Sequence, residues 1–467
     1  MQYKKILYPF FLSFFSISLS YISCKVPTPN QDNNNTNDVD KINDESVNTN
    51  NEPSTEITCE QNGPSWFFSS YNTNSDIPLI WSKDKDGSEP YFYMLKKQNN
   101  LFDKISVKSQ DDLLFGEAAP SIASSNLNDI YIFGGVNYSE NDKINSFKNG
   151  ILKISNSSSH ENIFTNSLSV DGSIGHKEID KRSNACLLYY DINNNIDNSY
   201  LFLFGGKNDH DFALGDGLLI DLTKKQHMFF GNDIDKYTNN IVSDWPTPRN
   251  SHICSLRQDI SRNSTNIYIA GGITDKESSL TDLWNVRVDH SEGSPSISSR
   301  LILKDSQRNQ SCIAINDSYY VIYGGFSKDN HRTLNDGLIV RLKDDKVSYF
   351  KINSLEGSEM GCIANDFSGG NDNIAISKSL GLLINIGKNK LTNIKNIVID
   401  DFFNTTTSPE NPYIAIGDMY DGPIFDECIG RKLLPYKKIH DNSVESGFIS
   451  LGREDGKYII IKKTFKK

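Results

Sequence analysis

The hydrophobic residues of this chain gather in short runs that recur along it, and four of these runs end in two glycines. Runs of about four to eight β-branched and aromatic residues bounded by glycine are typical of buried β-strands. The four runs are Ile130–Phe133, Leu201–Phe204, Ile267–Ala270 and Tyr320–Tyr323. They recur at intervals of roughly 50 to 70 residues, and the sequence between them also reads as strands, which favours a β-propeller over a helical solenoid.

We expect the paired glycines to have a structural role. Glycine lacks a Cβ atom, so it permits close approach of two backbones and a positive φ where a strand turns away from its neighbours. The eight glycines are Gly134, Gly135, Gly205, Gly206, Gly271, Gly272, Gly324 and Gly325. The pair Gly369-Gly370 does not belong to this group, because the residues before it do not form a strand pattern.

Each glycine pair has companions on both sides. Upstream lies a short strand that ends in cysteine, as in Arg182–Cys186, Arg249–Cys254, Arg308–Cys312 and, more degenerately, Glu359–Cys362. Downstream, a polar loop leads to another strand, as in Phe147–Leu152, Leu214–Leu219, Leu280–Asn285 and Leu334–Ile339. The pattern therefore describes a repeat of several strands and not a single recurring motif.

In this repeat the chain resembles the kelch family of β-propellers. The kelch repeat has Arg and His on an inner strand, an apolar strand that closes on Gly-Gly, and then Asp-Leu-Trp or Asp-Leu-Tyr. The segment from Trp245 to Trp284 is the best single copy, and the resemblance covers about residues 118–390 and extends to 60–467. Most copies have Asp-Gly-Leu where the family has its third-strand Trp, so the resemblance implies the fold and leaves the subfamily open.

The number of blades is less directly encoded. A weaker copy at Leu382–Gly387 and a C-terminal strand at Tyr458–Ile461 bring the count to six, which we favour, and Pro412–Gly417 makes seven possible. Because an open propeller would leave unpaired edges, we expect the ring to close through pairing between the two ends of the folded part. The expected partners are Gly447–Leu451 and Tyr458–Ile461 on one side and Leu79–Trp81 and Tyr91–Leu95 on the other.

The N-terminus has the pattern of an export signal. Lys4 and Lys5 precede an apolar stretch from Ile6 to Ile22, and Ser23-Cys24 follows. This end resembles the lipobox of bacterial lipoproteins, in which the cysteine is lipidated, although Tyr21 stands where that motif usually has Leu. An ordinary signal peptide and an uncleaved anchor remain alternatives. We predict a signal peptide over 1–23, a lipidated Cys24 with a disordered Asn/Asp-rich linker over 24–58, and the propeller over 59–467.

The seven cysteines divide by position. Cys186, Cys254, Cys312 and Cys362 occupy the same slot of successive repeats. Equivalent positions in different blades point the same way from separate sheets, so we expect four small buried thiols. Cys59 and Cys428 lie near opposite ends of the folded part, where a disulfide between them would suit an oxidising compartment. Two unrelated free thiols are the alternative.

Charge and motif content narrow the chemistry. The chain has 467 residues and a net charge of −11, from 48 Lys+Arg and 59 Asp+Glu. So acidic a chain disfavours nucleic acid and anionic membrane surfaces as main partners. Its eight histidines show no metal-ligand spacing, and no nucleophile elbow, phosphate loop or dinucleotide motif is present. We therefore predict no catalytic residue, no metal and no cofactor.

These observations favour a non-enzymatic function. We expect an exported, membrane-anchored lipoprotein of the cell envelope that binds a protein or glycan partner through propeller loops, because recognition usually resides in loops on a rigid scaffold. The long polar loops 137–149, 190–199 and 226–247 support this interpretation. The alternative is a sugar-active kelch enzyme, similar to the sialic-acid mutarotases or to copper oxidases of the galactose-oxidase type. The side of the membrane is left open.

Overall fold

The structure of the chain is a computed structural model. It describes the strands named below, Ile399, and most of residues 120–351, with gaps at 126–128, 139–143, 156–158, 163–168, 171–178, 193–194, 232–241, 277–278, 292, 306, 330–333 and 335. The chain divides into two units, 1–50 and 51–467, and every described strand belongs to the second.

The described residues form an all-β structure. They contain no α-helix, and their one helical element is the 3-10 turn η1 (Ile260–Arg262). Among the residues that the structure describes, no helix has the length and apolar character needed to cross a membrane.

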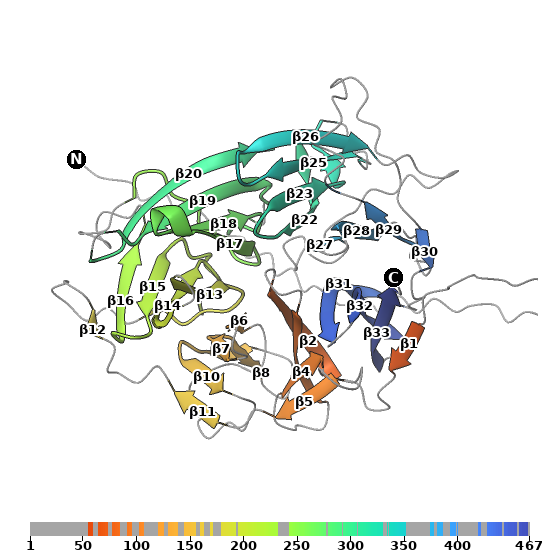
Figure 1. Ribbon diagram of the computed structural model, residues 1–467, viewed down its shortest axis with the longest axis horizontal. Helices are drawn as coiled ribbons and strands as arrows, with labels where there is room; N and C mark the ends of the chain where they lie inside the picture. The colour runs from red at the N-terminus through yellow and green to blue at the C-terminus, as the bar shows by residue number, and fades with distance from the viewer. Residues whose placement is uncertain are drawn as a thin grey trace, which may run out of the picture. The chain divides into compact units, whose positions relative to one another are not determined.

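Seven sheets of four or five strands follow one another along the described chain (Figure 1). The first three sheets consist of β2 (Pro64–Asn72), β3 (Ile77–Asp84), β4 (Tyr91–Leu95) and β5 (Phe102–Ser106); of β6 (Ser121–Ser124), β7 (Ile130–Phe133), β10 (Ile151–Ser155) and β11 (Ser159–Asn162); and of β13 (Cys186–Ile192), β14 (Asn195–Phe204), β15 (Gly217–Asp221) and β16 (Gln226–Phe230), with β12 (Ser169–Val170) parallel to β16. Apart from β12, paired strands in these sheets are antiparallel, as in a meander.

The remaining four large sheets continue this order. They consist of β17 (Ile253–Asp259), β18 (Ser264–Ala270), β19 (Asp282–Asp289) and β20 (Ser296–Lys304); of β22 (Cys312–Ile315), β23 (Tyr319–Tyr323), β25 (Asp336–Arg341) and β26 (Lys346–Lys351); of β27 (Ile374–Ser377), β28 (Gly381–Asn385), β29 (Asn393–Ile397) and β30 (Met419–Asp421); and of β31 (Glu427–His440), β32 (Ser443–Glu454), β33 (Lys457–Phe465) and β1 (Thr55–Thr58). Two small pairs, β8 (Val136–Tyr138) with β9 (Ile144–Phe147) and β21 (Arg308–Asn309) with β24 (Phe326–Ser327), complete the set.

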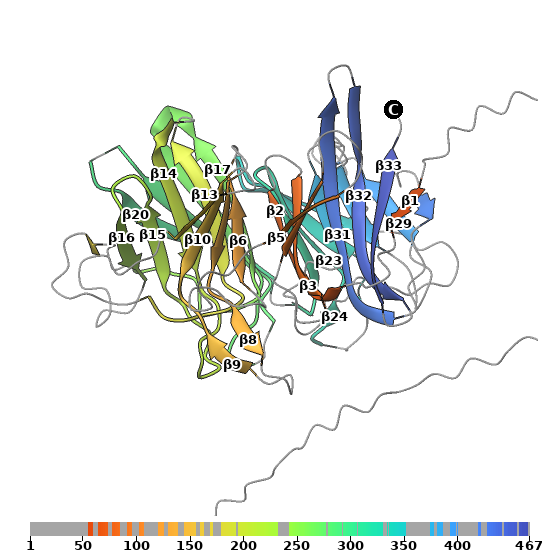
Figure 2. The same cartoon turned by 90° about the horizontal axis from the view of Figure 1, so that it is seen from below.

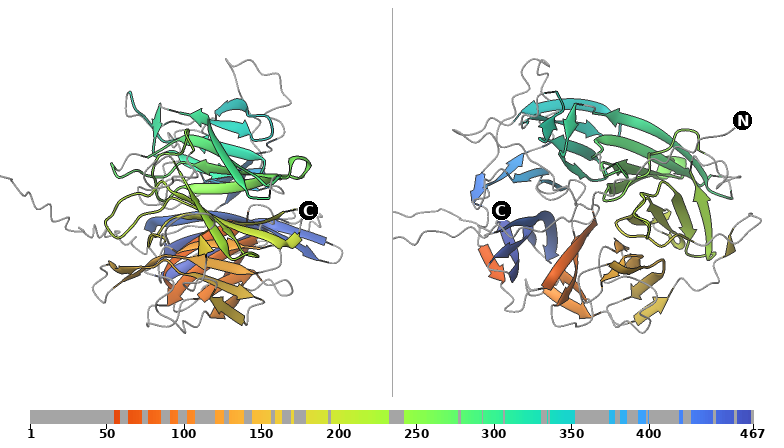
Figure 3. Two further views of the ribbon diagram at one scale, coloured as in Figure 1. Left: turned by 90° about the vertical axis from the view of Figure 1, so that its left-hand side faces the viewer. Right: turned by 180° about the vertical axis from the view of Figure 1, so that it is seen from behind.

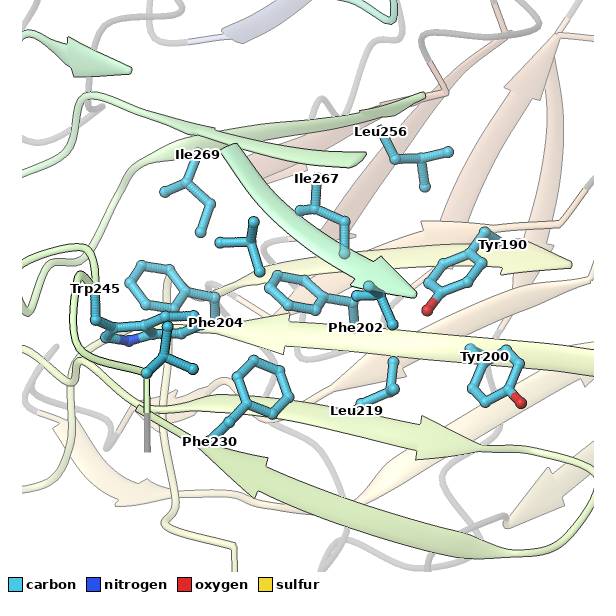
Figure 4. Packing of buried hydrophobic residues seen from close by; sticks show 13 residues of the cluster. Tyr190, Tyr200, Phe202, Phe204, Leu219, Phe230, Trp245, Leu256, Ile267 and Ile269 are labelled. Carbon is cyan, nitrogen blue, oxygen red and sulfur yellow. The ribbon is translucent and has the colours of Figure 1, made fainter. Parts of the chain in front are cut away.

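The core lies between consecutive sheets. One cluster packs the third sheet against the fourth and contains Phe202, Phe204, Trp245, Ile267 and Ile269 (Figure 4). Similar buried clusters fill the spaces between the second and third, the fourth and fifth, and the fifth and sixth sheets. Because the third, fourth and fifth sheets bury residues on both faces, their strands read as nearly continuous apolar runs, which is the pattern seen in the sequence.

The glycine pairs lie where one sheet closely approaches the next. At Gly205 φ is +65°, and a Cβ atom there would lie 2.6 Å from the carbonyl oxygen of Arg249. The Gly206 amide donates a hydrogen bond to that same carbonyl oxygen at 2.9 Å. All eight repeat glycines have positive φ. A side chain at Gly205 would therefore separate the third sheet from the start of the fourth.

A buried arginine stands at the start of three repeats. In the fourth sheet, Arg249 Nη1 and Nη2 donate to the Asp282 carboxylate at 2.6 and 2.8 Å, and Nη1 also donates to the Gly271 carbonyl oxygen at 2.9 Å. The same set of hydrogen bonds recurs in two other sheets. Arg182 donates to Asp216 and to the Gly205 carbonyl, and Arg308 donates to Asp336 and to the Gly324 carbonyl. The Arg, Gly-Gly and Asp of the sequence repeat thus form one hydrogen-bonded unit within each of these sheets.

The two ends of the folded unit meet in the seventh sheet. Strand β1 pairs with β33, from Thr55 opposite Lys463 to Thr58 opposite Ile460 (Figure 3, red beside blue). The longest strands, β31 and β32, form the hairpin of this sheet (Figure 2). The sheet also takes in the last four residues of the segment predicted as linker.

The C-terminal strands do pair with an N-terminal strand, but the predicted partner strands were wrong. Leu79–Trp81 and Tyr91–Leu95 pair with each other in the first sheet, and Gly447–Leu451 and Tyr458–Ile461 lie together in the seventh. The count of blades from the sequence treated these two sheets as one, because neither of them carries a Gly-Gly pair. Pro412–Gly417 lies outside the described residues.

The expectation of four separate buried thiols was also wrong. Cys186 and Cys254 form a disulfide, with their Cα atoms 6.1 Å apart. The two positions are not equivalent, because Cys186 is the fourth residue after Arg182 and Cys254 is the fifth after Arg249. Side chains alternate between the two faces of a strand, so this offset of one residue turns the two sulfurs toward each other across adjacent sheets. Cys312 is disulfide-bonded as well, and Cys362 lies outside the described residues.

Candidate functional site

A polar cleft of about 420 Å³ lies between the fourth and fifth sheets. Its walls come from the ends of β17 and β19, the starts of β18 and β20, the turn η1, and the turn between β25 and β26. Short hairpin connections build this cleft, and no described residue of the three long loops singled out in the sequence lines it.

Two rows of side chains cross the fourth sheet beneath the cleft. Strand register places Arg257, Asn266, Arg287 and Ser298 side by side, and it places Tyr268, Asn285 and Arg300 in the next row. Residues two apart on a strand share a face, so both rows point to the same side of the sheet. Arginine, amide and hydroxyl groups from four strands are thereby brought into one surface.

Positive charge predominates in the cleft. Its lining contains five cationic side chains, Arg257, Arg262, Arg287, Arg300 and Lys343, and two carboxylates, Asp259 and Asp345. Within the described chain, no carboxylate lies within ion-pair distance of Arg257 or Lys343. The excess of cations stands out in a chain whose net charge is −11.

The other cations of the cleft have partners close by. Arg300 Nη2 lies 2.6 Å from Asp345 Oδ2 and so links the two sheets, and Arg262 Nε lies 3.7 Å from Asp259 Oδ2. Arg287 is paired with a residue outside the lining, Asp289, at 3.2 Å. These exposed pairs are weak in water, so an incoming anion can exchange with them.

Buried polar groups form the floor of the cleft. The Tyr268 hydroxyl donates to the Leu342 carbonyl oxygen at 3.2 Å, and burial raises its pKa while Arg257 opposes that shift. Asn285 is 7% exposed; its Nδ2 donates to Asn266 Oδ1 at 3.2 Å, while its own Oδ1 has no hydrogen-bond partner among the described residues. The floor therefore offers an acceptor beside the arginines.

A second hollow of about 230 Å³ lies on the other side of the β19–β20 turn, lined in part by Tyr200, Lys224 and His290. His290 Nε2 is 3.4 Å from the Tyr190 hydroxyl. Burial lowers the pKa of His290 to about 4, against the opposing effect of Asp289, so its imidazole is neutral near pH 7. This hollow lies between the third and fourth sheets and shares no lining residue with the cleft.

A cluster of sulfur and nitrogen atoms lies near the opposite end of β17. The Sγ atoms of Cys186 and Cys254 and a ring nitrogen of His252 all lie within 4.8 Å of one another. Burial, reinforced by the nearby Arg249, lowers the pKa of His252 to about 3, and the Phe204 carbonyl opposes this shift. Neither ring nitrogen of His252 makes a hydrogen bond with a described residue.

The residues singled out from the sequence are only partly described. The eight glycines lie at sheet junctions and not in a pocket. Cys24 and Cys59 lie outside the described residues, and so does the side chain of Cys428, whose backbone is in β31. The Cys59–Cys428 disulfide and the lipidation of Cys24 stay predictions.

Sequence reasoning missed the cleft arginines and the cysteine–histidine cluster. The arginines occur once in the repeat series, so no periodic pattern marks them. The cluster had a signal, which is the spacing from each repeat arginine to its cysteine, four residues in one repeat and five in the next.

The stacked antiparallel sheets, with cores between them, define a β-propeller-like protein with a polar cleft between two sheets. Residues 241–373 match a family model described as Recombination activating protein 2. This range contains all strands of the fourth and fifth sheets and spans less than half of the chain. No curated protein matches the chain.

Two solved structures are similar to the chain at low identity. One, described as "Cryo-EM structure of RAG in complex with one melted RSS and one unmelted RSS", has 14% identity and a TM-score of 0.40, covering 73% of this chain and 94% of that chain. The other, "Structure of YjhT", has 9% identity and a TM-score of 0.41, covering 84% and 99%. Neither similarity transfers a residue role to this chain.

Proposed function

We propose that this protein is a β-propeller interaction protein that binds an acidic macromolecular partner, a protein or a glycan, through the cleft between the fourth and fifth sheets. The observation that carries the proposal is the five cations against two carboxylates in a cleft of an otherwise acidic chain. Like charges gathered in a cleft focus their field and attract ligands of opposite sign.

The chemistry of the cleft suits carboxylate, sulfate or phosphate groups. Arginine presents a planar fork of donors that matches such oxygens, and Arg257 has no ion-pair partner among the described residues. Asn285 Oδ1 accepts a hydrogen bond, so a ligand with a hydroxyl or amide N–H next to its anionic group fits best. Both glycans and polypeptides offer this combination.

The proposal includes a ring of seven blades. The inner strands of consecutive sheets contact one another from β2 through β6, β13, β17, β22 and β27 to β31, and β31 also contacts β3 of the first sheet. These contacts support closure between the seventh and first sheets. A closed ring holds the hairpin turns that build the cleft in fixed positions.

We also propose that the protein is an exported, membrane-anchored lipoprotein of the cell envelope. The support is in the sequence: Lys4 and Lys5, the apolar segment to Ile22, and Ser23-Cys24, followed by a polar stretch without aromatic residues. Lipid on Cys24 would tether the folded unit to a membrane. Mass spectrometry of the mature N-terminus tests this part, and a mature chain that does not begin at an acylated Cys24 contradicts it.

Binding of defined polyanions to the full-length protein tests the cleft. The probes are polyglutamate, an acidic polypeptide, and heparin, a sulfated glycan, each at physiological ionic strength and at higher salt. We expect the double variant Arg257→Ser/Lys343→Ser to bind at least one probe about tenfold more weakly and with a shallower salt dependence.

Arg341→Ser is the matched control. Arg341 is an arginine at the end of β25 that pairs with Asp344 and does not line the cleft. The control should bind like the unmodified protein. Equal binding by the double variant and the unmodified protein would overturn the proposal, and turnover of a sugar would favour the enzyme alternative.

A further inference from the structure

Three metal-binding side chains meet between the third and fourth sheets, away from the cleft. Cys186 begins β13, Cys254 is the second residue of β17, and His252 precedes that strand. Their donor atoms lie within 4.8 Å of one another. Among the described residues the group has these three members.

His252 makes the cluster unusual. It is 7% exposed, and neither ring nitrogen has a hydrogen-bond partner of acceptable geometry in the described chain. A buried polar group without a partner costs free energy, so such a group calls for an explanation. A ring nitrogen facing two cysteine sulfurs is explained if all three bind the same ion.

We infer that reduction of the Cys186–Cys254 disulfide opens a binding site for Zn²⁺ that consists of the two cysteines and His252. Two thiolates and one imidazole are a ligand set typical of zinc, with the fourth position left for water or another small ligand. The two thiolate charges balance the charge of the ion, so the buried site is neutral overall.

The reaction requires a dithiol reductant. The S–S bond of Cys186–Cys254 breaks as it takes up two electrons and two protons, and the reductant is oxidised to its own disulfide. Zn²⁺ then displaces the two thiol protons as two Zn–S bonds form, and a ring nitrogen of His252 donates its lone pair to the ion. Oxidation of the two cysteines reverses the process and releases the ion.

The surrounding geometry allows this change. Zn–S bonds of about 2.3 Å in a tetrahedron place two sulfurs about 3.8 Å apart, and Cα atoms 6.1 Å apart accommodate that separation by side-chain rotation. Cys254 is only partly buried, which leaves access for a reductant and an ion. Gly205 leaves space for the ring, since a Cβ there would lie 2.7 Å from His252 Cε1.

Zinc titration of the full-length protein tests the inference. Metal-free protein is reduced with a dithiol, the reductant is removed without air, and Zn²⁺ affinity is measured against a chromogenic chelator. Co²⁺ serves as a spectroscopic probe, because thiolate-to-cobalt absorption reports sulfur ligation. We expect one tight site in the reduced protein and none in the oxidised protein.

Variants assign the site. His252→Ser introduces the residue found at the same distance from the repeat arginine in the next repeat, Ser311 after Arg308. It should weaken Zn²⁺ binding by at least about tenfold, and Cys254→Ser should remove the site. Cys312→Ser is the control that alters another bonded cysteine and should leave the affinity unchanged.

Three results would overturn the inference. They are Zn²⁺ affinity unaffected by His252→Ser, a tight site that survives Cys254→Ser, and a disulfide that is reduced only when circular dichroism shows unfolding. Polyanion binding at the cleft is a separate measurement, so the zinc inference and the proposed function can fail independently of each other.

Discussion

The two ends of the fourth sheet carry arginines in opposite circumstances. Arg249, four residues before β17 begins, is 0% exposed, and its guanidinium donates hydrogen bonds to Asp282 and to the carbonyl oxygens of Gly271 and Thr247. Eight residues later, Arg257 is half-buried, and no carboxylate of the described residues pairs with it. One sheet thus contains an arginine that completes the fold and an arginine available to a ligand.

Under the proposed function, this contrast means that one repeat combines stability with binding. An equivalent buried arginine pairs with the equivalent aspartate in the third and fifth sheets, so this pair belongs to the repeat. The cleft arginines do not recur, and they lie where hairpin turns of two sheets meet. Side chains outside the repeat pattern are free to serve recognition because the packing of the sheets does not depend on them.

The largest effect should come from breaking the buried pair. Arg249→Met leaves Asp282 buried without its partner, so we expect the free energy of unfolding to fall by about 3 to 5 kcal/mol in urea denaturation. Arg257→Met, near the end of β17, should change it by less than about 0.5 kcal/mol. The double variant Arg249→Met/Asp282→Leu should regain part of the loss. Equal losses at the two ends would remove the distinction between them.

The disulfide beside Arg249 should have the next largest effect. Cys254→Ser removes a link between residues separated by 68 positions, and disulfides of such span contribute about 2 to 4 kcal/mol. Thermal unfolding without reductant measures the loss. Peptide mapping of the unmodified protein should recover Cys186 joined to Cys254, and a different partner for Cys254 would contradict the structure.

Acid should weaken the same end of the sheet through His252. The pKa of His252 is about 3 in the folded chain, against 6.5 for a histidine exposed to water, so between these values the unfolded chain binds more protons. Stability therefore falls as the pH drops below about 6.5, by about 2 kcal/mol for this residue between pH 7 and pH 5. Urea denaturation at both pH values measures it. In His252→Ser this part of the pH dependence should be absent.

The cleft should show the smallest effect on stability. Arg257→Ser removes one cation from a group that contains more cations than carboxylates, so the free energy of unfolding should stay within about 0.5 kcal/mol of the unmodified value. Raising the salt concentration should reduce any difference further. A loss of several kcal/mol would mean that Arg257 is part of the structural core and not of a binding surface.

The fold was predictable because its repeat is encoded locally. Apolar runs such as Ile267–Ala270 became buried strands, and the glycines after them adopt positive φ at sheet junctions. Strand β1 was not predicted because Thr55–Thr58 is short and polar. Its strand character comes from pairing with β33, which no local pattern reveals.

The cleft and the cysteine cluster were harder to predict for different reasons. The cleft depends on strand register, which places Arg257 beside Asn266 and Arg287 although they are far apart in the sequence. The cluster depends on a single-residue offset between repeats that otherwise look alike. A comparison of repeat positions by strand face, and not by motif alone, would have separated Cys254 from Cys186.

The pairing of β1 with β33 bears on how the protein is made. Thr55 is among the first residues of the folded unit to leave the ribosome, and its partner Lys463 is among the last. The seventh sheet therefore stays incomplete until almost all of the folded unit has been synthesised, and folding includes a late contact of very long sequence separation. Until that moment β33 is missing from the growing chain, and the edges of β1 and β32 stay open to pairing with other chains.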